Sequence, residues 1–270
     1  MFRFEKQKFD LQIQPYFLAY WEYERYEPIP ILEPLPAVGV MHLEFHAGNT
    51  IRGIIDNKFK QSSKITFAGM LPSSGNFIQP HGYYMTYGIT ISPLGMWRLF
   101  GVRSTDCLNG FADYDDVCSE PLPDLLSTPL GKEGSIIRFN LINDWCLKLL
   151  RQKNDALSKI EKFTTAITQS QGSAKILSLV EDGSMRQMQR NFKELTGISP
   201  KHYASLLRFN TAMALITANP NSSLIEVALR AGYYDTSHLC HDFKKLGLNL
   251  PTEWAKSPND HTASLLESLH

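Results

Sequence analysis

Residues 184–200 read SMRQMQRNFKELTGISP, and residues 235–251 read DTSHLCHDFKKLGLNLP. The second stretch repeats the first at an offset of 51 positions. This offset relates three pairs of residues: Phe192 with Phe243, Lys193 with Lys244, and Pro200 with Pro251. A repeat period of this size is typical of one supersecondary unit that is used twice in a chain.

The residues that begin and end helices divide each copy in the same way. Ser184 and Asp235 are N-cap candidates, because their side-chain oxygens can accept hydrogen bonds from the free N–H groups of a first helical turn. Pro200 and Pro251 suit the first turn of a following helix. A shorter helical segment precedes each capped helix, AKILSLVE in the first copy and LIEVALRA in the second. The sequence therefore predicts helix, tight turn and helix, twice.

The capped helix of the first copy separates into two faces. The apolar face contains Met185, Met188, Phe192 and Leu195, and a second face contains Arg186, Gln189, Arg190 and Lys193. Arginine can bind guanine bidentately, glutamine suits adenine, and lysine reaches phosphate. The second face therefore has the chemistry needed to read a DNA major groove.

The second copy has the same division with a less basic face. Its apolar side contains Leu239, Phe243 and Leu246, and its polar side contains Ser237, Cys240, His241 and Lys244. For a single helix, a solvated surface face is the ordinary interpretation of such a pattern. The duplication, with the caps in register, instead favours two reading helices.

Residues 170–258 resemble the paired helix-turn-helix domain of the AraC/XylS family of transcription regulators. The resemblance is carried by RQMQRNFKELTGISPKHYASLLRF and by IEVALRAGYYDTSHLCHDFKK followed by LP. It implies two helix-turn-helix units joined by a long helix, here about Pro200 to Ala218. Both recognition helices would then enter successive major grooves on one face of double-stranded DNA.

The resemblance also assigns roles by position. The residues expected to face bases are Arg186, Gln189 and Arg190 in the first helix and Ser237, His238 and His241 in the second. Lys193, Lys244 and Arg208 are expected either near phosphates or as packing residues. Residues 165–258 contain ten Lys and Arg against seven Asp and Glu. This charge is modest for DNA binding, so we expect the affinity to require a homodimer.

The residues before about 120 have a different pattern. Short runs rich in Val, Ile, Tyr and Phe alternate with Gly, Pro and Asn, which predicts β-strands joined by turns. Residues 118–134 contain three prolines and two glycines and are expected to form a connector, with one helical turn at LPDLL. Residues 135–152 have an amphipathic pattern, which predicts a helix that serves as core or as a dimer seam.

These patterns predict an α+β fold with four parts. Residues 1–120 form a β-rich sensing or dimerisation domain, and residues 121–164 a connector with the amphipathic helix. Residues 165–258 form an all-α domain of two helix-turn-helix units, and residues 259–270 a C-terminal tail. The N-terminal part resembles, less specifically, the β-rich domains that precede this module in some family members, through AYWEYE, ILEPLP and ISPLGMWRLFGV. That resemblance implies a small effector or a dimer contact, often on a cupin-like barrel.

The stretch MHLEFH places His42, Glu44 and His46 on one face of a strand, opposite Met41, Leu43 and Phe45. Two imidazoles and a carboxylate suit a metal ion. Polar alternation is also the default of a half-buried strand, so we interpret this face as solvent-exposed and assign no metal site. We expect His81, which follows Pro80 in a turn-like stretch, to be structural or exposed.

The composition of the chain limits which classes of protein and which binding partners remain possible. The 27 Lys and Arg equal the 27 Asp and Glu, so net charge favours neither nucleic acid nor membrane. The start of the chain lacks the apolar segment of a secretory signal, which favours a cytoplasmic location. Residues 82–102 are broken by Gly, Pro and Arg and predict a buried strand and a short helix rather than a membrane span. The four cysteines lack metal-ligand spacing and are expected to be reduced thiols.

We conclude from the sequence that the chain is a sequence-specific transcription regulator that binds promoter or operator DNA. It is not expected to be an enzyme or to hold a cofactor, and a small effector and RNA polymerase are the further partners that the resemblance implies. Two alternatives stay open. One is a cupin-type metal-binding enzyme that uses His42, Glu44 and His46, and the other is an interaction adaptor that carries a helix-turn-helix module.

Overall fold

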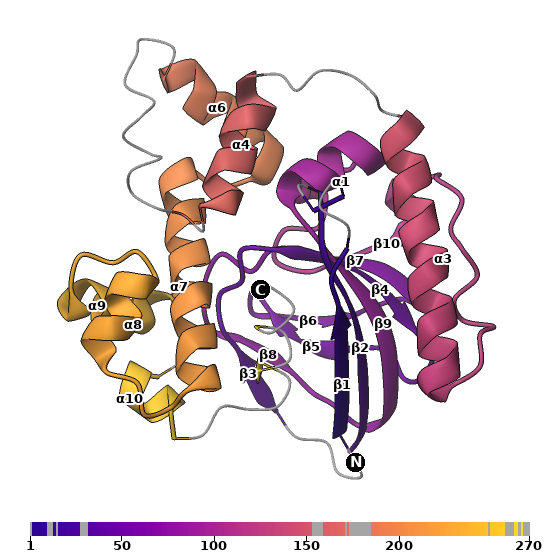
Figure 1. The fold of residues 1–270 in the computed structure, drawn as a ribbon, viewed down its shortest axis with the longest axis horizontal. Coiled ribbons are helices and arrows are strands. Elements are labelled where there is room, and N and C mark those ends of the chain that lie inside the picture. The colour runs from indigo at the N-terminus through magenta and orange to yellow at the C-terminus, as the bar shows by residue number, and fades with distance from the viewer. Residues whose placement is uncertain are drawn as a thin grey trace.

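The fold is α+β, with two antiparallel sheets followed by a helical C-terminal part (Figure 1). The computed structural model describes residues 2–9, 13, 14, 16–27, 32–152, 159–170, 172, 185–247, 249–256, 262, 263 and 266. The sheets lie on one side of the molecule and the helices from α7 (Pro200–Ala218) to α10 (Pro251–Trp254) on the other, with α3 (Gly131–Gln152) along the far flank of the sheets.

The larger sheet has six strands in the order β1-β2-β9-β4-β7-β10. Their bounds are β1 Phe2–Gln7, β2 Phe17–Glu27, β4 Met41–His46, β7 Ile65–Ala68, β9 Gly82–Ile91 and β10 Phe111–Asp113. Each pairing is antiparallel, and the central β9 pairs with β2 on one side and β4 on the other. The strand and short helix that the sequence predicts over residues 82–102 are β9 and α1, Pro93–Phe100.

The smaller sheet has four strands in the order β3-β8-β5-β6. Their bounds are β3 Glu33–Leu35, β5 Arg52–Ile55, β6 Lys58–Gln61 and β8 Asn76–Ile78. The cupin-like barrel implied by the resemblance is wrong for the part of the chain that the structure describes. The four strands of the smaller sheet hydrogen-bond with one another and not with the larger sheet, so the strands stack as two sheets rather than closing into one.

The two faces of the larger sheet are buried against different partners. On one face Met41, Leu43 and Phe45 pack in the main core with side chains of α1 and α3, Gly131–Gln152. The other face turns towards the smaller sheet, where Leu35, Ile55 and Ile78 form a separate apolar cluster. Strand alternation sends successive side chains to these two faces.

A buried ion pair fixes α3 on the larger sheet. Arg138 is fully buried, and its Nε and Nη2 atoms donate to the two carboxylate oxygens of Glu22 at 2.8 Å each. Its guanidinium also lies 4.0 Å from the centre of the Tyr87 ring, and Nη1 donates to the carbonyl of Pro129 at 2.6 Å. The predicted amphipathic helix is confirmed, but it begins four residues earlier than the pattern indicates, at Gly131.

The connector before α3 is not helical at LPDLL, where the sequence predicts one helical turn. The short helix of this region is instead α2, Tyr114–Val117, and the 3₁₀ turn η1 covers Ser104–Asp106. The carbonyls of Pro121 and Pro129 accept hydrogen bonds from Trp145 and Arg138 of α3. These bonds hold the connector along the helix, and Leu125 to Thr128 form a hydrogen-bonded turn that does not continue into a helix.

The helical part follows the predicted plan. Its described helices are α4 Lys159–Gln169, α6 Met185–Thr196, α7 Pro200–Ala218, α8 Leu224–Arg230, α9 Thr236–Leu246 and α10 Pro251–Trp254. The predicted long helix from Pro200 to Ala218 is confirmed as α7, and Pro200 and Pro251 begin helices as expected. The proposed cap Ser184 and the short helix at residues 174–181 lie outside the described residues.

The helical part is hydrogen-bonded to the sheets through residues 37–39, which we call the docking segment. Asn210 of α7 donates to the carbonyl of Ala37 at 2.7 Å and accepts from the N–H of Gly39 at 3.0 Å. The N–H of Ala37 donates to the carbonyl of Leu246, at the end of α9, at 3.0 Å. A second contact joins His202 of α7 to the carbonyl of Pro72 at 2.8 Å.

The predicted tail is not free of the body of the protein. Thr262 and Leu266 are buried, and the hydroxyl of Thr262 donates weakly to the carbonyl of Pro34 in β3 at 3.5 Å. The four cysteines are free thiols. No helix among the described residues is long and apolar enough to cross a membrane.

Candidate nucleic-acid interface

Helix α6 exposes the polar face that the sequence predicts for it. Phe192 is fully buried between the rings of Phe163 and Tyr203, at centroid distances of 5.9 and 5.6 Å, and Leu195 is buried beside it. The opposite face is exposed and contains Arg186, Gln189, Arg190 and Lys193. Packing of one face on α4 and α7 therefore leaves the other face accessible.

Most of the cationic charge on this face is available for a ligand. The guanidinium of Arg190 lies 3.6 Å from the carboxylate of Glu194, one turn further along α6, with both side chains about two-thirds exposed. Exposed pairs of this kind contribute about 0.3–0.5 kcal/mol, so a phosphate or a guanine edge can replace Glu194 at little cost. Arg186 and Lys193 add two further exposed cations on the same helix.

Helix α9 repeats the arrangement. Asp235 is the N-cap, as the sequence predicts, and its carboxylate accepts from the N–H of His238 at 2.8 Å. Leu239, Phe243 and Leu246 are buried, with the Phe243 ring packed edge-on against Phe209 of α7 at 5.0 Å. The exposed face contains Ser237, His238, His241 and Lys244, while Cys240 is only half-exposed.

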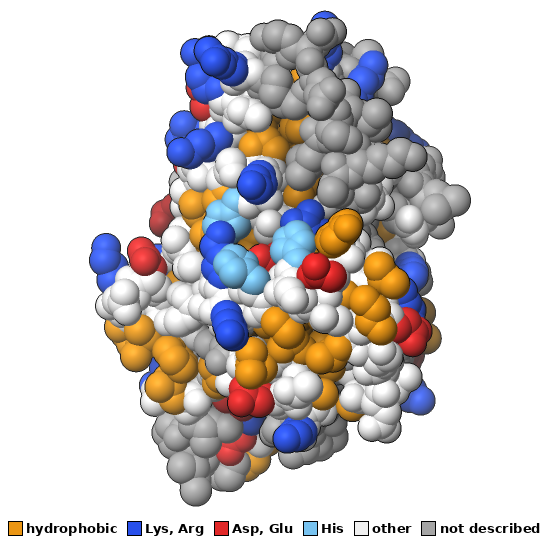
Figure 2. All heavy atoms as spheres, turned by 90° about the vertical axis from the view of Figure 1, so that its left-hand side faces the viewer, with side chains coloured by type: hydrophobic (Ala, Val, Ile, Leu, Met, Phe, Trp, Pro, Cys, Tyr) orange, Lys and Arg blue, Asp and Glu red, His pale blue; other side chains and the backbone are white. Residues whose placement is uncertain are grey.

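The two histidines of α9 have different neighbours. His238 packs edge-on against the ring of Tyr233 at 5.0 Å, which limits its freedom to turn. His241 is 73% exposed, and its Nδ1 atom lies 3.6 Å from the carboxylate of Asp242. Figure 2 shows that basic and histidine side chains gather on the side of the molecule where α7 to α9 lie. Both exposed faces thus carry cationic side chains, Arg186, Arg190 and Lys193 on α6 and Lys244 on α9.

Arg208 is a packing residue. The sequence leaves open whether it lies near phosphates or supports packing. It is 6% exposed, its Nη1 atom donates to the carbonyl of Gly172 at 2.6 Å, and its guanidinium lies 5.6 Å from the centre of the Tyr233 ring. A side chain in this position cannot reach a DNA backbone.

The strand face of His42, Glu44 and His46 is buried, so the interpretation as a solvent-exposed face is wrong. All three residues are at most 6% exposed, because the smaller sheet covers this face of β4. His46 lies 3.0 Å from the hydroxyl of Thr86 and 3.4 Å from the Glu44 carboxylate. His42 lies 3.3 Å from the hydroxyl of Thr90. Within the described residues no group of three or more His, Cys, Asp and Glu side chains is arranged to hold a metal ion.

Sequence reasoning missed the docking segment and Asn210. One signal for Asn210 was present, since it is a polar residue within the apolar stretch LLRFNTAMAL of the predicted long helix. A buried amide in such a place needs hydrogen-bond partners, which indicates a contact with another element. The identity of that element, residues 37–39, has no local signal.

Comparison with known proteins agrees with the geometry of the helical part. Residues 182–257 match the family model of a helix-turn-helix domain. Two packed helices with exposed polar faces, joined by α7 and covered by this match, define a DNA-binding module. The chain carries an AraC-type helix-turn-helix domain at residues 182–257, the DNA-binding module of a class of transcription regulators.

A search of the curated proteins finds no match. Among solved structures, the chain is similar to ToxT from Vibrio cholerae at 1.65 Å resolution, with 12% identity, a TM-score of 0.46, and coverage of 94% of this chain and 98% of that chain. It is also similar to wild-type ToxT with a bound unsaturated fatty acid, with 11% identity, a TM-score of 0.48, and coverage of 92% and 96%. These values are too low to assign a ligand or a target to this chain.

Proposed function

We propose that the protein is a sequence-specific transcription regulator that binds double-stranded DNA with α6 and α9 in successive major grooves. The observation that carries the proposal is the repeated pair of exposed polar helix faces, each packed by its apolar side against the same long helix, α7. A rigid connecting helix gives the two faces a fixed separation, which a protein needs if it is to recognise two grooves in register.

We infer the roles of individual residues from their chemistry and exposure. Arg186, Gln189 and Arg190 of α6 and Ser237, His238 and His241 of α9 are the candidates for base contacts. Lys193 and Lys244 are the candidates for phosphate contacts. The first helix offers two guanidinium groups that can bind guanine bidentately, whereas the second offers none, so α6 should contribute more to sequence preference.

We expect Arg190→Ala to weaken binding to the preferred DNA site by about 1–3 kcal/mol and to relax base preference in one half of that site. Lys193→Ala should weaken binding to all sequences nearly alike, because phosphate contacts carry no sequence information. The preferred site comes from selection with wild-type protein on a random DNA pool, and both variants then repeat the selection. Unchanged base preference for Arg190→Ala would remove Arg190 from the reading face.

We further propose that the protein acts as a homodimer through the β-rich part and α3, with the chain divided near residues 120, 164 and 258. The outer face of α3 exposes Ile136, Ile137 and Leu141. Exposed Glu133 lies near one end of this face and Lys148 near the other, so an antiparallel pair of α3 helices brings opposite charges together. Dimerisation would double the number of phosphate contacts, which offsets the modest charge of one helical part.

Leu141→Glu is expected to raise the dimer dissociation constant by at least about ten-fold, because two like charges then meet at the centre of the contact. Phe59→Glu is the matched control, since Phe59 is 68% exposed on β6, away from α3. Sedimentation equilibrium of the full chain measures the dimer dissociation constant of the wild type and of both variants. Equal effects of the two substitutions would place the dimer contact elsewhere. A monomeric wild type would mean that there is no dimer contact.

A further inference from the structure

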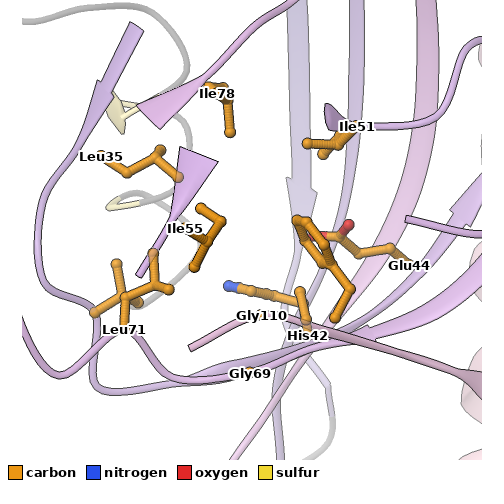
Figure 3. Close-up of a pocket in the computed structure, with 12 residues that line it drawn as sticks. Leu35, His42, Glu44, Ile51, Ile55, Gly69, Leu71, Ile78 and Gly110 are labelled. Carbon is orange, nitrogen blue, oxygen red and sulfur yellow. The ribbon is translucent and has the colours of Figure 1, made fainter. Parts of the chain in front are cut away.

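A pocket lies between the two sheets, with branched aliphatic side chains as most of its wall (Figure 3). Leu35, Ile55 and Ile78 line it from the smaller sheet, and Val38 and Leu71 from the loops that lead away from the sheets. The cavity volume open to the centres of water-sized molecules is about 60 Å³, within about 500 Å³ of empty space that includes open solvent. A wall of this kind favours a small ligand with a mainly apolar surface.

The His42 ring points into this pocket, and one of its two nitrogens lacks a partner among the described residues. His42 is 4% exposed, and its Nδ1 atom lies 3.3 Å from the hydroxyl of Thr90. Its other ring nitrogen, Nε2, has no hydrogen-bond partner among the described residues. Figure 3 shows a ring nitrogen of His42 directed towards the space beside Ile55 and Leu71. A buried polar atom without a partner costs free energy, which a ligand atom at this position would recover.

The surroundings hold the ring in place and are compatible with the tautomer that carries its hydrogen on Nε2. Trp21 packs edge-on against the His42 ring at 5.6 Å, and Gly88 leaves the space that the indole fills, since a Cβ there would overlap it. When the Thr90 hydroxyl donates to Nδ1, the ring hydrogen lies on Nε2. Burial lowers the pKa of His42 to about 4, although Glu44 raises it, so the ring is neutral near pH 7. In this tautomer His42 presents one neutral N–H donor to the pocket.

The side chain of Glu44 disfavours an anionic ligand. Its side chain lines the same pocket, and Figure 3 shows its carboxylate on the side near Ile51. No lysine or arginine is among the described residues that line the pocket. A ligand carboxylate would therefore meet a like charge in a poorly solvated space without a compensating cation.

We propose that this pocket binds a small neutral molecule with an apolar body and a single hydrogen-bond acceptor, such as a ketone oxygen, which accepts from Nε2 of His42. The pocket residues connect directly to the helical part. Val38 and Leu71 are bonded to each other, with N–H to carbonyl distances of 2.7 and 3.0 Å. Their neighbours Ala37, Gly39 and Pro72 form hydrogen bonds with side chains of α7. Ala37 also donates to Leu246 at the end of α9.

Occupation of the pocket therefore changes the position of the second recognition helix relative to the first, through the docking segment. An occupant presses on Val38 and Leu71, and the adjacent Ala37 N–H caps the last turn of α9 through Leu246. This consequence, unlike the binding itself, rests on the proposed DNA-binding function.

Three five-membered-ring probes test the binding on the full chain: cyclopentanone, cyclopentane and cyclopentanecarboxylate. Titrations followed by NMR are expected to give an affinity for the ketone about five-fold above that for the hydrocarbon, which is the contribution of one hydrogen bond. The carboxylate is expected to bind at least about ten-fold more weakly than the ketone, because it meets Glu44. Absence of binding for all three probes, or tightest binding of the carboxylate, would overturn the proposal.

Substitutions locate the site. His42→Leu should abolish the preference for ketone over hydrocarbon while hydrocarbon binding persists, and Glu44→Gln should strengthen carboxylate binding. Leu71→Trp should fill the pocket and weaken all three probes. His81→Leu, which changes an exposed histidine outside the pocket, is the matched control and should leave every affinity unchanged. A ketone preference that survives in His42→Leu would remove Nε2 as the donor.

A DNA-binding titration with saturating cyclopentanone tests the coupling. The affinity for the selected DNA site should change by at least about five-fold in the wild type, a usual size for coupling between two sites. Asn210→Asp keeps the shape of the side chain but cannot donate to Ala37, so its DNA affinity should respond less to the probe. Probe binding without DNA binding would reject the proposed function and leave the pocket assignment intact. DNA binding without probe binding would reject the pocket assignment and leave the proposed function intact.

Discussion

Replacing Arg138 with methionine is expected to lower the free energy of unfolding by about 3–5 kcal/mol, because the substitution removes one member of a buried ion pair. The guanidinium makes two bonds of 2.8 Å to Glu22, and the Tyr20 hydroxyl donates to the same carboxylate at 2.6 Å. Without Arg138 the Glu22 carboxylate stays at 1% exposure without its cation. Urea unfolding followed by near-UV circular dichroism measures the change.

The control for this prediction is Arg151→Met, which removes an exposed arginine near the end of the same helix and should change stability by less than about 0.5 kcal/mol. The double substitution Arg138→Met with Glu22→Leu should restore much of the loss, since an apolar pair can replace a buried ion pair. A loss below about 1 kcal/mol in Arg138→Met alone would show that the pair does not hold α3 on the sheet.

The protein is expected to lose stability as the pH falls from about 6.5 to about 4, in part because of His42. Burial lowers the pKa of His42 to about 4 in the folded protein, against about 6.5 for an unperturbed histidine. Between these values the unfolded chain binds a proton that the folded chain does not, so the unfolded state gains stability as the pH falls. The difference amounts to roughly 3 kcal/mol once the pH is below both values.

His42→Leu should therefore lose roughly 3 kcal/mol less than the wild type between pH 7 and pH 4, as measured by urea unfolding at each pH. The groups that act on His42 are Glu44, which raises its pKa, and its neighbours Thr90 and Trp21, which carry no charge. His202, whose pKa is also lowered by burial, titrates in both proteins and does not affect the difference. Equal losses in His42→Leu and wild type would mean that His42 is not buried as a neutral ring.

The helical part could be predicted from the sequence because its signals are local. Pro200 at the first turn of α7 and Asp235 at the N-cap of α9 determine where these helices begin. The spacing of Phe192 and Leu195, and of Leu239 and Phe243, determines which face packs. Each signal lies within a few residues of the element that it defines.

The surroundings of β4 could not be predicted in the same way. Alternation separates His42 and Glu44 from Leu43, but it does not indicate what covers each face. The cover over His42 comes from strands of the smaller sheet, whose pairing joins residues 33–35 to 76–78 and 52–55 to 58–61. The partners of Arg138 and Asn210 are 116 and 171 positions away, and no local pattern identifies such pairs.

Hydroxyl-radical footprinting of the full chain on its selected DNA site tests the central claim most directly. The account predicts two protected backbone segments for each protomer, on one face of the duplex and about 10 base pairs apart, one for α6 and one for α9. Arg190→Ala should weaken protection in one of these segments and leave the other in place. A single protected segment, or protection that does not depend on DNA sequence, would contradict the assignment of two reading helices.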